Sequence, residues 1–199
     1  MKHIPGNQAR RAGIALAAVA AFAAPGIGTA QAAPTFATAD ISINSVGFLD
    51  ASFKETGLTP GGSVDYTSVA TDVGWMTQCF IKNKPVAKIA PRLHVAHAAD
   101  GLTTDRTLLA SNRGTITSSI LTAYPTAEET HGEVPLCPEV EGVVITEEIT
   151  AIRWCNASLT DTTNSTVGAS VPTLFLQIIR NGSSAVPDCG ALAGMPSDY

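Results

Sequence analysis

Short stretches in which apolar and polar residues alternate recur along the chain. Residues 41–44 read I-S-I-N, and within residues 64–68 the side chains of Val64, Tyr66 and Ser68 face away from those of the residues between them. A period of two is typical of a strand with one buried face, and no long stretch shows the 3.6-residue spacing of an amphipathic helix. Further strands are expected over residues 74–82, 92–97, 115–122, 143–159 and 173–180.

Turn-forming residues separate these stretches. The range 143–159 is longer than an ordinary strand, so we expect it to be bent or split. Many short strands divided by turns at this spacing predict an antiparallel sandwich or barrel, and the expected fold class is all-β. The turn clusters lie at residues 57–62, 100–101, 112–114, 162–165 and 181–182.

Two segments lack the alternation. Residues 125–142 are rich in glutamate and include a cysteine, which predicts an exposed acidic loop tied down at Cys137. Residues 187–199 are rich in glycine, proline and alanine, which predicts a tail that runs along the surface and is held by Cys189. The glutamates of the loop are Glu128, Glu129, Glu133, Glu139 and Glu141.

The first residues have the parts of a secretory signal peptide. Basic residues within positions 2–11 precede an uncharged, alanine-rich run at 12–24, which a Pro-Gly pair then breaks. Small residues at the positions that a signal peptidase reads predict cleavage between Ala32 and Ala33. The alternative is a membrane anchor, which needs about 20 apolar residues, and this run is shorter. We therefore expect a bacterial signal peptide over 1–32, a secreted protein, and no membrane span after cleavage.

Removal of this segment changes the charge balance. The full chain has 12 basic and 17 acidic side chains and a net charge of −5; three basic residues and no acidic ones precede the cut, which leaves −8. The remaining Lys and Arg are scattered, whereas nucleic-acid binding depends on clustered basic residues, so we expect no nucleic-acid partner. The length of residues 33–199 suits a single domain.

Four cysteines follow the predicted cleavage point. An even number in an exported chain predicts two disulfides, and sequence alone allows three pairings. None lies in the CxxC spacing that would indicate a redox or zinc site. In the chain-entropy account each disulfide would stabilise the fold by about 4 kcal/mol. The cysteines are Cys79, Cys137, Cys155 and Cys189.

Two groups of segments carry a resemblance to known proteins. They are F-K-E-T-G-L at 53–58, Pro60-Gly61, V-x-Y at 64–66, L-C-P at 136–138, the strand ending at Trp154, and S-L-T-D-T-T-N at 158–164. These segments cover about half of the mature chain and resemble small secreted bacterial proteins that are immunoglobulin-like and have no assigned activity. The resemblance implies an antiparallel immunoglobulin-like β-sandwich and an extracellular location, and it carries no function over.

The resemblance also bears on the cysteines. Members of the group carry cysteines near positions 79 and 137, which implies that Cys79 pairs with Cys137 and Cys155 with Cys189. The same features resemble the antitumour-antibiotic-binding apoproteins, which are secreted, acidic and immunoglobulin-like with four cysteines. That likeness would imply a small-ligand carrier, although the cysteine separations here are much larger than the hairpin disulfides of that family.

Histidines and carboxylates suggest three metal sites, each with a plainer interpretation. His94 and His97 are three residues apart, so on a strand they point to opposite faces and do not share an ion. His131 and the glutamates of the acidic loop are suitable calcium or zinc ligands, but a solvated run of charge is the commoner case. Asp100 and Asp105 lack the repeated oxygen ligands of a calcium loop. We expect no metal and no cofactor.

No catalytic motif stands out in the sequence. There is no G-x-S-x-G elbow, and the cysteines are expected in disulfides. Trp75 and Trp154 are expected to pack over the disulfides, the alternative being an exposed platform for sugars. A triad assembled only in the folded chain stays open.

The favoured hypothesis is a non-catalytic module that acts by surface contact with a protein, the cell envelope or a small molecule. One alternative is a small-ligand carrier with an apolar cleft at one end of the sandwich. The other is a hydrolase with a non-standard site, in which His94, His97 or His131 approaches a carboxylate in a deep cleft.

Overall fold

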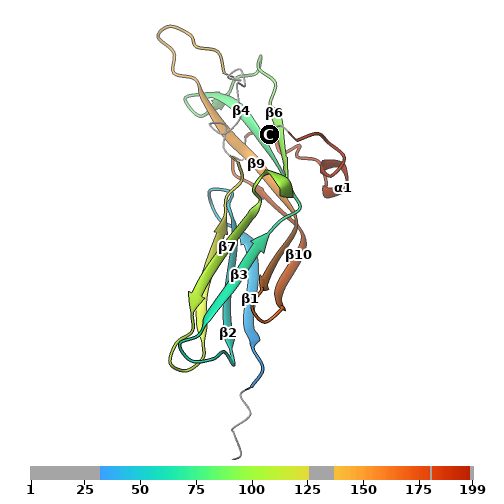
Figure 1. The fold of residues 1–199 in the computed structure, drawn as a ribbon. Coiled ribbons are helices and arrows are strands. Elements are labelled where there is room, and N and C mark those ends of the chain that lie inside the picture. Colours follow the sequence, from blue (N-terminus) through green and yellow to red (C-terminus); the bar gives the residue numbers. More distant parts are fainter. Residues whose placement is uncertain (1–31, 126–136, 180, 198–199) are drawn as a thin grey trace, which may run out of the picture. The chain divides into compact units, whose positions relative to one another are not determined.

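Antiparallel strands make up most of the computed structural model, which describes residues 32–125, 137–179 and 181–197. Three strands form one sheet in the order β1-β2-β8 (Figure 1). Both neighbouring pairs in this sheet are antiparallel. The bounds are Thr35–Ile43 for β1, Leu49–Thr56 for β2 and Ile116–Thr122 for β8.

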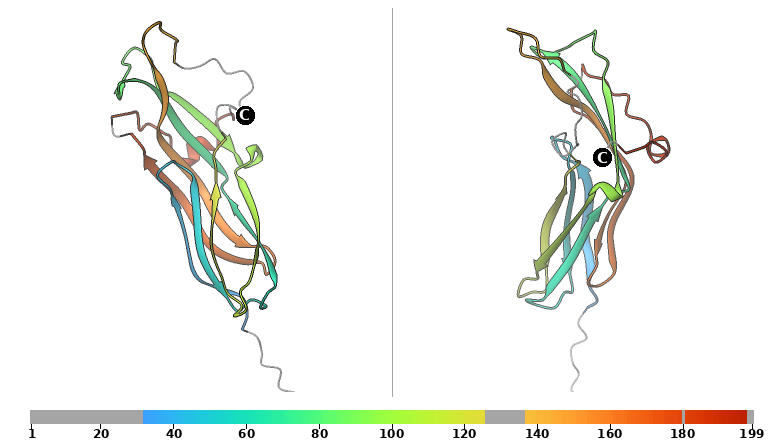
Figure 2. Two further views of the ribbon diagram at one scale, coloured as in Figure 1. Left: turned by 90° about the vertical axis from the view of Figure 1, so that its left-hand side faces the viewer. Right: turned by 45° about the horizontal axis from the view of Figure 1, so that its top comes forward.

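The second sheet contains the other seven strands of the described residues. Its path runs β5-β4-β9-β3-β7, with β10 also paired to β9 and β6 to β4. Figure 2 shows these strands from two further sides, with β10 alongside β9. The bounds are Ser63–Val69 for β3, Asp72–Ile81 for β4, Lys84–Pro85 for β5, Arg92–His97 for β6, Thr103–Leu109 for β7, Thr146–Asp161 for β9 and Thr166–Gln177 for β10.

The alternating residues line the space between the two sheets. On β2, Leu49, Ala51 and Phe53 are buried while the residues between them are more exposed. Tyr66 and Trp154 enter the same core cluster from the second sheet and are fully buried. Burial of each large apolar side chain contributes roughly 1.5–3 kcal/mol, so this shared core is what holds the sheets face to face.

β4 differs from the other strands because both of its faces are buried over nearly its whole length. One face contributes Trp75 to the core between the sheets. The other contributes Met76 to a second, smaller cluster that also contains Val186 and Leu192. Residues 181–197, called the C-terminal strap below, therefore cover the outer face of the second sheet. The strap includes a short helix, α1 (Cys189–Leu192).

At one position along the second sheet, β3 ends and β4 begins, β6 ends and β7 begins, and the continuous strand β9 has an irregular backbone conformation. Val69 pairs with Ser158 and Asp72 with Cys155 in one continuous register, so β3 and β4 are two parts of a single line along β9. On their other side, a 3-10 turn, η1 (Ala98–Asp100), separates β6 from β7. On β9, Asn156 has a φ of 48°, in the left-handed region. We call this position the strand break.

The strands agree with the sequence pattern at most points. Each range expected to be a strand overlaps one, and the described chain is all-β. The long range near 143–159 overlaps a single strand of 16 residues, β9, which is not split and in which Asn156 has a left-handed conformation. Three strands were not expected: the two-residue β5, β7, whose residues are mostly polar and mostly exposed, and β2, although its residues alternate between buried and more exposed positions.

The C-terminal residues depart from expectation. Cys189 holds them, as expected, but they do not simply trail along the surface, because Leu192 is fully buried. The predicted signal peptide through residue 31 and residues 126–136 of the acidic loop, with His131, lie outside the described residues. Within the described ranges, no helix is long and apolar enough to cross a membrane.

Candidate functional site

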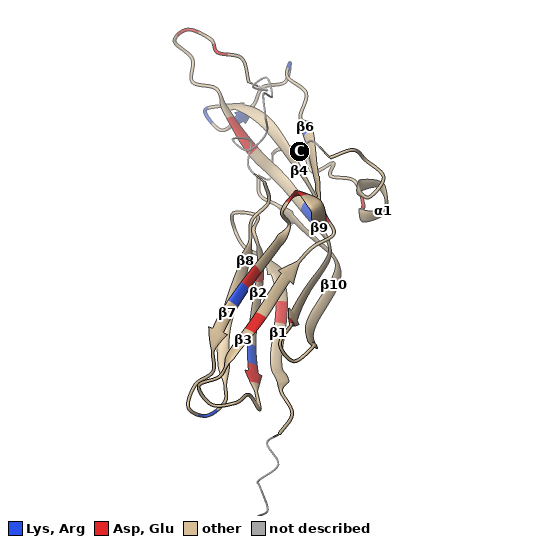
Figure 3. Cartoon of the chain, viewed as in Figure 1, with Lys and Arg blue, Asp and Glu red and all other residues tan. Residues whose placement is uncertain are grey.

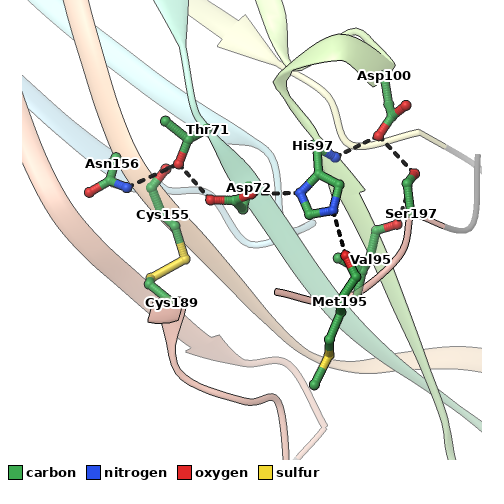
Figure 4. Close-up of polar contacts among 10 residues, drawn as sticks. All are labelled: Thr71, Asp72, Val95, His97, Asp100, Cys155, Asn156, Cys189, Met195 and Ser197. Atoms are coloured by element: carbon green, nitrogen blue, oxygen red, sulfur yellow. Dashed lines mark hydrogen bonds and ion pairs between the residues drawn. A yellow bond between two sulfur atoms is a disulfide. The ribbon is translucent and has the colours of Figure 1, made fainter. Parts of the chain in front are cut away.

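The strand break gathers a chain of polar side chains (Figure 4). Asp72 is the first residue of β4 and His97 is the last residue of β6, and the two are paired in the sheet. Their side chains meet on one face, where the Nδ1 atom of His97 lies 2.6 Å from Oδ1 of Asp72. Asp100 closes η1 and accepts a hydrogen bond of 2.6 Å from the backbone N–H of His97.

The C-terminal strap completes this cluster. The Nε2 atom of His97 lies 2.9 Å from the carbonyl oxygen of Met195. The hydroxyl of Ser197 donates to Oδ2 of Asp100 at 2.8 Å. Both contacts join residues about a hundred positions apart in the chain, so the strap is held at the strand break by side chains of β6 and η1.

The same network continues across β4 to β9. The Thr71 hydroxyl donates to Oδ2 of Asp72 at 2.7 Å, and the amide of Asn156 donates to Thr71 at 3.0 Å. The disulfide between Cys155 and Cys189 lies beside these residues and ties the strap to β9 (Figure 4). The cluster therefore connects four parts of the chain: β4, the β6–η1 turn, β9 and the strap.

The hydrogen-bond geometry favours the protonated form of His97. Both of its ring nitrogens face acceptors, a carboxylate and a backbone carbonyl, and an imidazole can donate from both nitrogens only when it is protonated. The hydrogen bond to Asp72, followed by the one to Met195, raises the pKa of His97 above its ordinary value, while partial burial opposes the change. In its protonated form His97 donates to both partners and so joins β4 to the strap, and we call this arrangement the clasp.

Apolar contacts between the C-terminal strap and β4 add to these hydrogen bonds. Leu192 of α1 packs against Gly74 of β4, where a Cβ atom would lie only 2.6 Å from the leucine side chain. The cluster around it contains Val95, Ala151 and Val186. Gly74 thus provides the space that the strap needs to reach the sheet.

A second polar cluster lies inside the core, between the sheets. Tyr66 donates its hydroxyl to Oε2 of Glu55 at 2.7 Å, and the carboxyl of Asp161 lies next to Glu55. Asn164 binds both oxygens of Asp161, at 2.9 Å through its backbone N–H and 2.6 Å through its side chain. Glu55, Tyr66 and Asp161 are fully buried. These residues come from the segments at 53–58, 64–66 and 158–164 that carry the family resemblance.

Burial has a strong effect on Glu55. Removal from water raises the pKa of Glu55 to about 7; the Tyr66 hydrogen bond opposes this rise, and the charge of Asp161 adds to it. Oε1 of Glu55 is buried and has no hydrogen-bond partner when the group is ionised. A proton on Glu55 would supply a donor toward the neighbouring carboxylate, so this environment favours the protonated form of Glu55.

A third feature is the turn that precedes β9. Val143 donates its N–H to the carbonyl of Val140 at 3.0 Å, and Gly142 has a φ of 76°, as the third position of a type II turn requires. We call residues 139–144 the valine turn. It borders a hollow of about 480 Å³ that is lined by residues of 137–145. The acidic residues of this turn are marked in Figure 3.

The structure separates the two histidines that the sequence brings together. His94 is buried, lies 3.1 Å from the Thr77 hydroxyl through Nε2 and stacks on Trp75, whereas His97 belongs to the strand break. Asp105 accepts a hydrogen bond from Thr67 and is not part of the cluster around Asp100. Among the residues that the structure describes, no group of three or more His, Cys, Asp or Glu side chains is arranged to hold a metal ion.

Both disulfides pair as the resemblance implies. Cys79 is bonded to Cys137 and Cys155 to Cys189. The tryptophans lie in the core between the sheets, and Trp154 donates to the carbonyl of Gly47 at 2.9 Å. Trp154 and Cys155 are neighbours on β9 and point to opposite faces, so Trp154 does not pack over that disulfide.

The sequence does not single out Asp72, Met195 or Ser197. Asp72 could have been found, because it is a charged residue at the start of a mostly apolar stretch, and a buried charge needs a partner. Met195 contributes only a backbone carbonyl, which no side-chain pattern reveals.

Comparisons with known proteins add no assignment to this geometry. The chain matches no protein-family profile, no curated protein and no solved structure.

Proposed function

We propose that this chain is a secreted bacterial β-sandwich module, immunoglobulin-like in type, that acts by contact with another surface and not by catalysis. The observation that carries the proposal is the bonding of His97. Its ring nitrogens lie 2.6 Å from Asp72 and 2.9 Å from the Met195 carbonyl, so in the closed arrangement both are occupied by structural contacts and not by a substrate. A histidine held in this way fixes a segment of chain.

Two further features support an extracellular module. Disulfides persist in oxidising compartments, and two of them tie the chain together. Two antiparallel sheets with a shared apolar core are the architecture from which immunoglobulin-like sandwiches are built.

The valine turn is the surface that we propose for contact. Val144 is 80% exposed, and Val140 and Val143 are also exposed, so three apolar side chains from one turn face solvent. The Cys79–Cys137 disulfide anchors the start of this segment, which limits the conformational freedom lost on binding. Apolar groups on a constrained turn are suited to a protein contact.

The acidic residues beside the valines indicate which kind of partner surface would fit the turn. Glu139 and Glu141 flank the valines and are exposed, and the chain carries a net charge of −5. A second copy placed symmetrically on the turn would bring these carboxylates together, and an anionic lipid surface would repel them. We therefore propose a protein partner whose apolar patch is bordered by Lys or Arg.

The test compares two exposed apolar sites. The secreted protein is immobilised and its binding to the envelope and secreted proteins of its own source is measured for the wild type, the triple variant Val140→Ser/Val143→Ser/Val144→Ser and the control Leu109→Ser. Leu109 is 74% exposed on β7, so its replacement is matched in exposure. We expect at least a tenfold loss of binding in the triple variant, as for residues at the centre of an interface, and little change in the control.

Two outcomes would contradict the proposal. One is equal binding by the triple variant and the wild type. The other is turnover of esterase, glycosidase or protease substrates by purified protein that is lost in His97→Gln, since catalysis would then need the residue that we assign to a structural clasp.

A further inference from the structure

The C-terminal strap is held in its middle and at its end by contacts of different kinds. In the middle, the Cys155–Cys189 disulfide and the packing of Leu192 on Gly74 attach it to β9 and β4. Beyond Leu192, the Met195 side chain packs at the edge of the small apolar cluster, and polar contacts at the strand break run from the Met195 carbonyl to His97 and from Ser197 to Asp100. The first attachment does not depend on protons, whereas the second includes a titratable ring.

The groups around His97 explain why its charge matters. From β4 it is faced by Asp72, from η1 by Asp100, and from the strap by the Met195 carbonyl and the neighbouring Ser197 hydroxyl. The charged groups in this set are both carboxylates, and each favours the protonated ring. The next groups along the network, Thr71 and Asn156, carry no charge.

Loss of one proton removes one of the two hydrogen bonds of the ring. A neutral imidazole has a single N–H, and a carboxylate is a stronger acceptor than a backbone carbonyl, so the remaining proton stays on Nδ1 facing Asp72. The lone pair of Nε2 then points at the Met195 carbonyl oxygen, and two acceptors 2.9 Å apart repel each other. The contact that fails on deprotonation is therefore the one to the strap.

We propose that His97 is a proton-controlled clasp, and that its deprotonation releases the end of the C-terminal strap while the Cys155–Cys189 disulfide keeps the rest of the strap in place. The direction is fixed by the sign of the charge. In acidic surroundings the ring is charged and the strap is closed. As the pH rises through the pKa of His97, residues 193–197 detach and uncover apolar side chains such as Leu93 at the edge of the small cluster.

Hydrogen exchange tests this proposal on the oxidised, full-length secreted protein. The N–H groups of Gly194 and Met195 bond to the carbonyls of Ala191 and Leu192 in a turn that detachment of residues 193–197 would open, so their protection reports whether the end of the strap is closed. Protection, corrected for the intrinsic pH dependence of exchange, is followed upward from pH 5.5 until the ring resonance of His97 has shifted completely. We expect a fall of about tenfold or more that coincides with the His97 titration, because a hydrogen bond to a charged group is worth that factor in an equilibrium constant.

Two variants separate the clasp from a general loss of stability. His97→Gln is uncharged at every pH and cannot donate to both partners, so its strap should be open at low pH as well. Glu55→Gln removes a group inside the core, away from the strap, whose pKa is raised to about 7, and should leave the strap response unchanged. A wild-type strap whose protection does not change through the His97 titration would overturn the proposal, as would a His97→Gln protein that keeps the pH-dependent opening.

Discussion

Single residues show where the chain departs from an ordinary apolar core, and Glu55 is the clearest case. Its carboxyl group is fully buried, receives one hydrogen bond from Tyr66 and lies beside Asp161. An ionised carboxylate in this position is costly, because water is excluded and the nearest charge has the same sign. The molecule meets this cost by keeping a proton on Glu55 at pH values where an exposed glutamate is ionised.

The first prediction concerns the pH dependence of stability through Glu55. Its pKa is raised from 4.5 to about 7 in the folded chain, so the folded state binds the proton more tightly than the unfolded state does. The stability from this group is complete below about pH 4.5 and is lost as the pH rises toward 7, by on the order of 1–2 kcal/mol. Glu55→Gln keeps the acceptor for Tyr66 and adds a donor toward Asp161, so its urea unfolding curves should change less between pH 5 and pH 8.

A matched control for that substitution is Asp40→Asn, which replaces an exposed carboxylate on β1. This variant should keep the full pH dependence of the wild type. The explanation fails if Glu55→Gln and Asp40→Asn show the same loss of unfolding free energy between the two pH values.

A second prediction concerns the backbone at the strand break. Asn156 has a φ of 48°, which asparagine and glycine tolerate better than β-branched residues do. Asn156→Val should therefore lower the free energy of unfolding by about 2 kcal/mol, while Asn156→Gly should cost less, since it loses only the hydrogen bond to Thr71. Thermal unfolding of the two variants at one pH measures the difference; equal destabilisation would show that the backbone conformation is not the cause.

At the scale of elements, the strap and the second sheet depend on each other. β4 is buried on both faces, and the strap contributes Val186 and Leu192 to the cluster on its outer face. In turn, the strap has little regular structure of its own beyond the four residues of α1. The pairing of a doubly buried strand with a short, irregular C-terminal segment is what places Met195 and Ser197 at the strand break.

The third prediction tests the contact between these elements. Gly74→Ala would put a methyl group 2.6 Å from the Leu192 side chain, so we expect destabilisation by about 1–3 kcal/mol and faster hydrogen exchange in α1. Gly190→Ala lies in the strap itself, but its nearest neighbour would be the Asp188 carboxylate at 3.5 Å, an ordinary contact. Urea unfolding should therefore show little change for Gly190→Ala, and an equal loss in both variants would contradict the proposed fit.

At the scale of the whole molecule, the two disulfides join different parts of the fold. The Cys79–Cys137 bond links β4 to the segment before β9, and the Cys155–Cys189 bond links β9 to the strap. Their sequence separations are 58 and 34 residues. Because the entropy of loop closure grows only with the logarithm of loop length, the two bonds should stabilise the fold by similar amounts.

The fourth prediction follows from that comparison. The double variants Cys79→Ala/Cys137→Ala and Cys155→Ala/Cys189→Ala should each lose up to about 4 kcal/mol of unfolding free energy at pH 5.5. Their local effects should differ, since only Cys155→Ala/Cys189→Ala removes the covalent link between β9 and the middle of the strap. Hydrogen exchange at Ala193 and Gly194 should accelerate in that variant alone, and acceleration in both would mean that the strap opens only with the whole fold.

Much of the fold was predictable from local patterns. The alternation at 115–122 marks β8 because burial of one face requires it. The candidate site was less predictable. His97 was noticed through its spacing to His94, yet the structure places the two in separate surroundings and joins His97 to Asp72, 25 positions earlier.

The sequence by itself determined most of the strand positions, several turns and the presence of two disulfides, because each depends on residues close together or on a simple count. Only the tertiary structure decided which strands lie side by side, that the irregular positions of neighbouring strands coincide at the strand break, and that the C-terminal strap contacts His97. Those features depend on register between distant segments and on the burial of particular faces. The charge of His97 and the proton on Glu55 follow from them, because a pKa reflects the groups that folding brings near and the water that it removes.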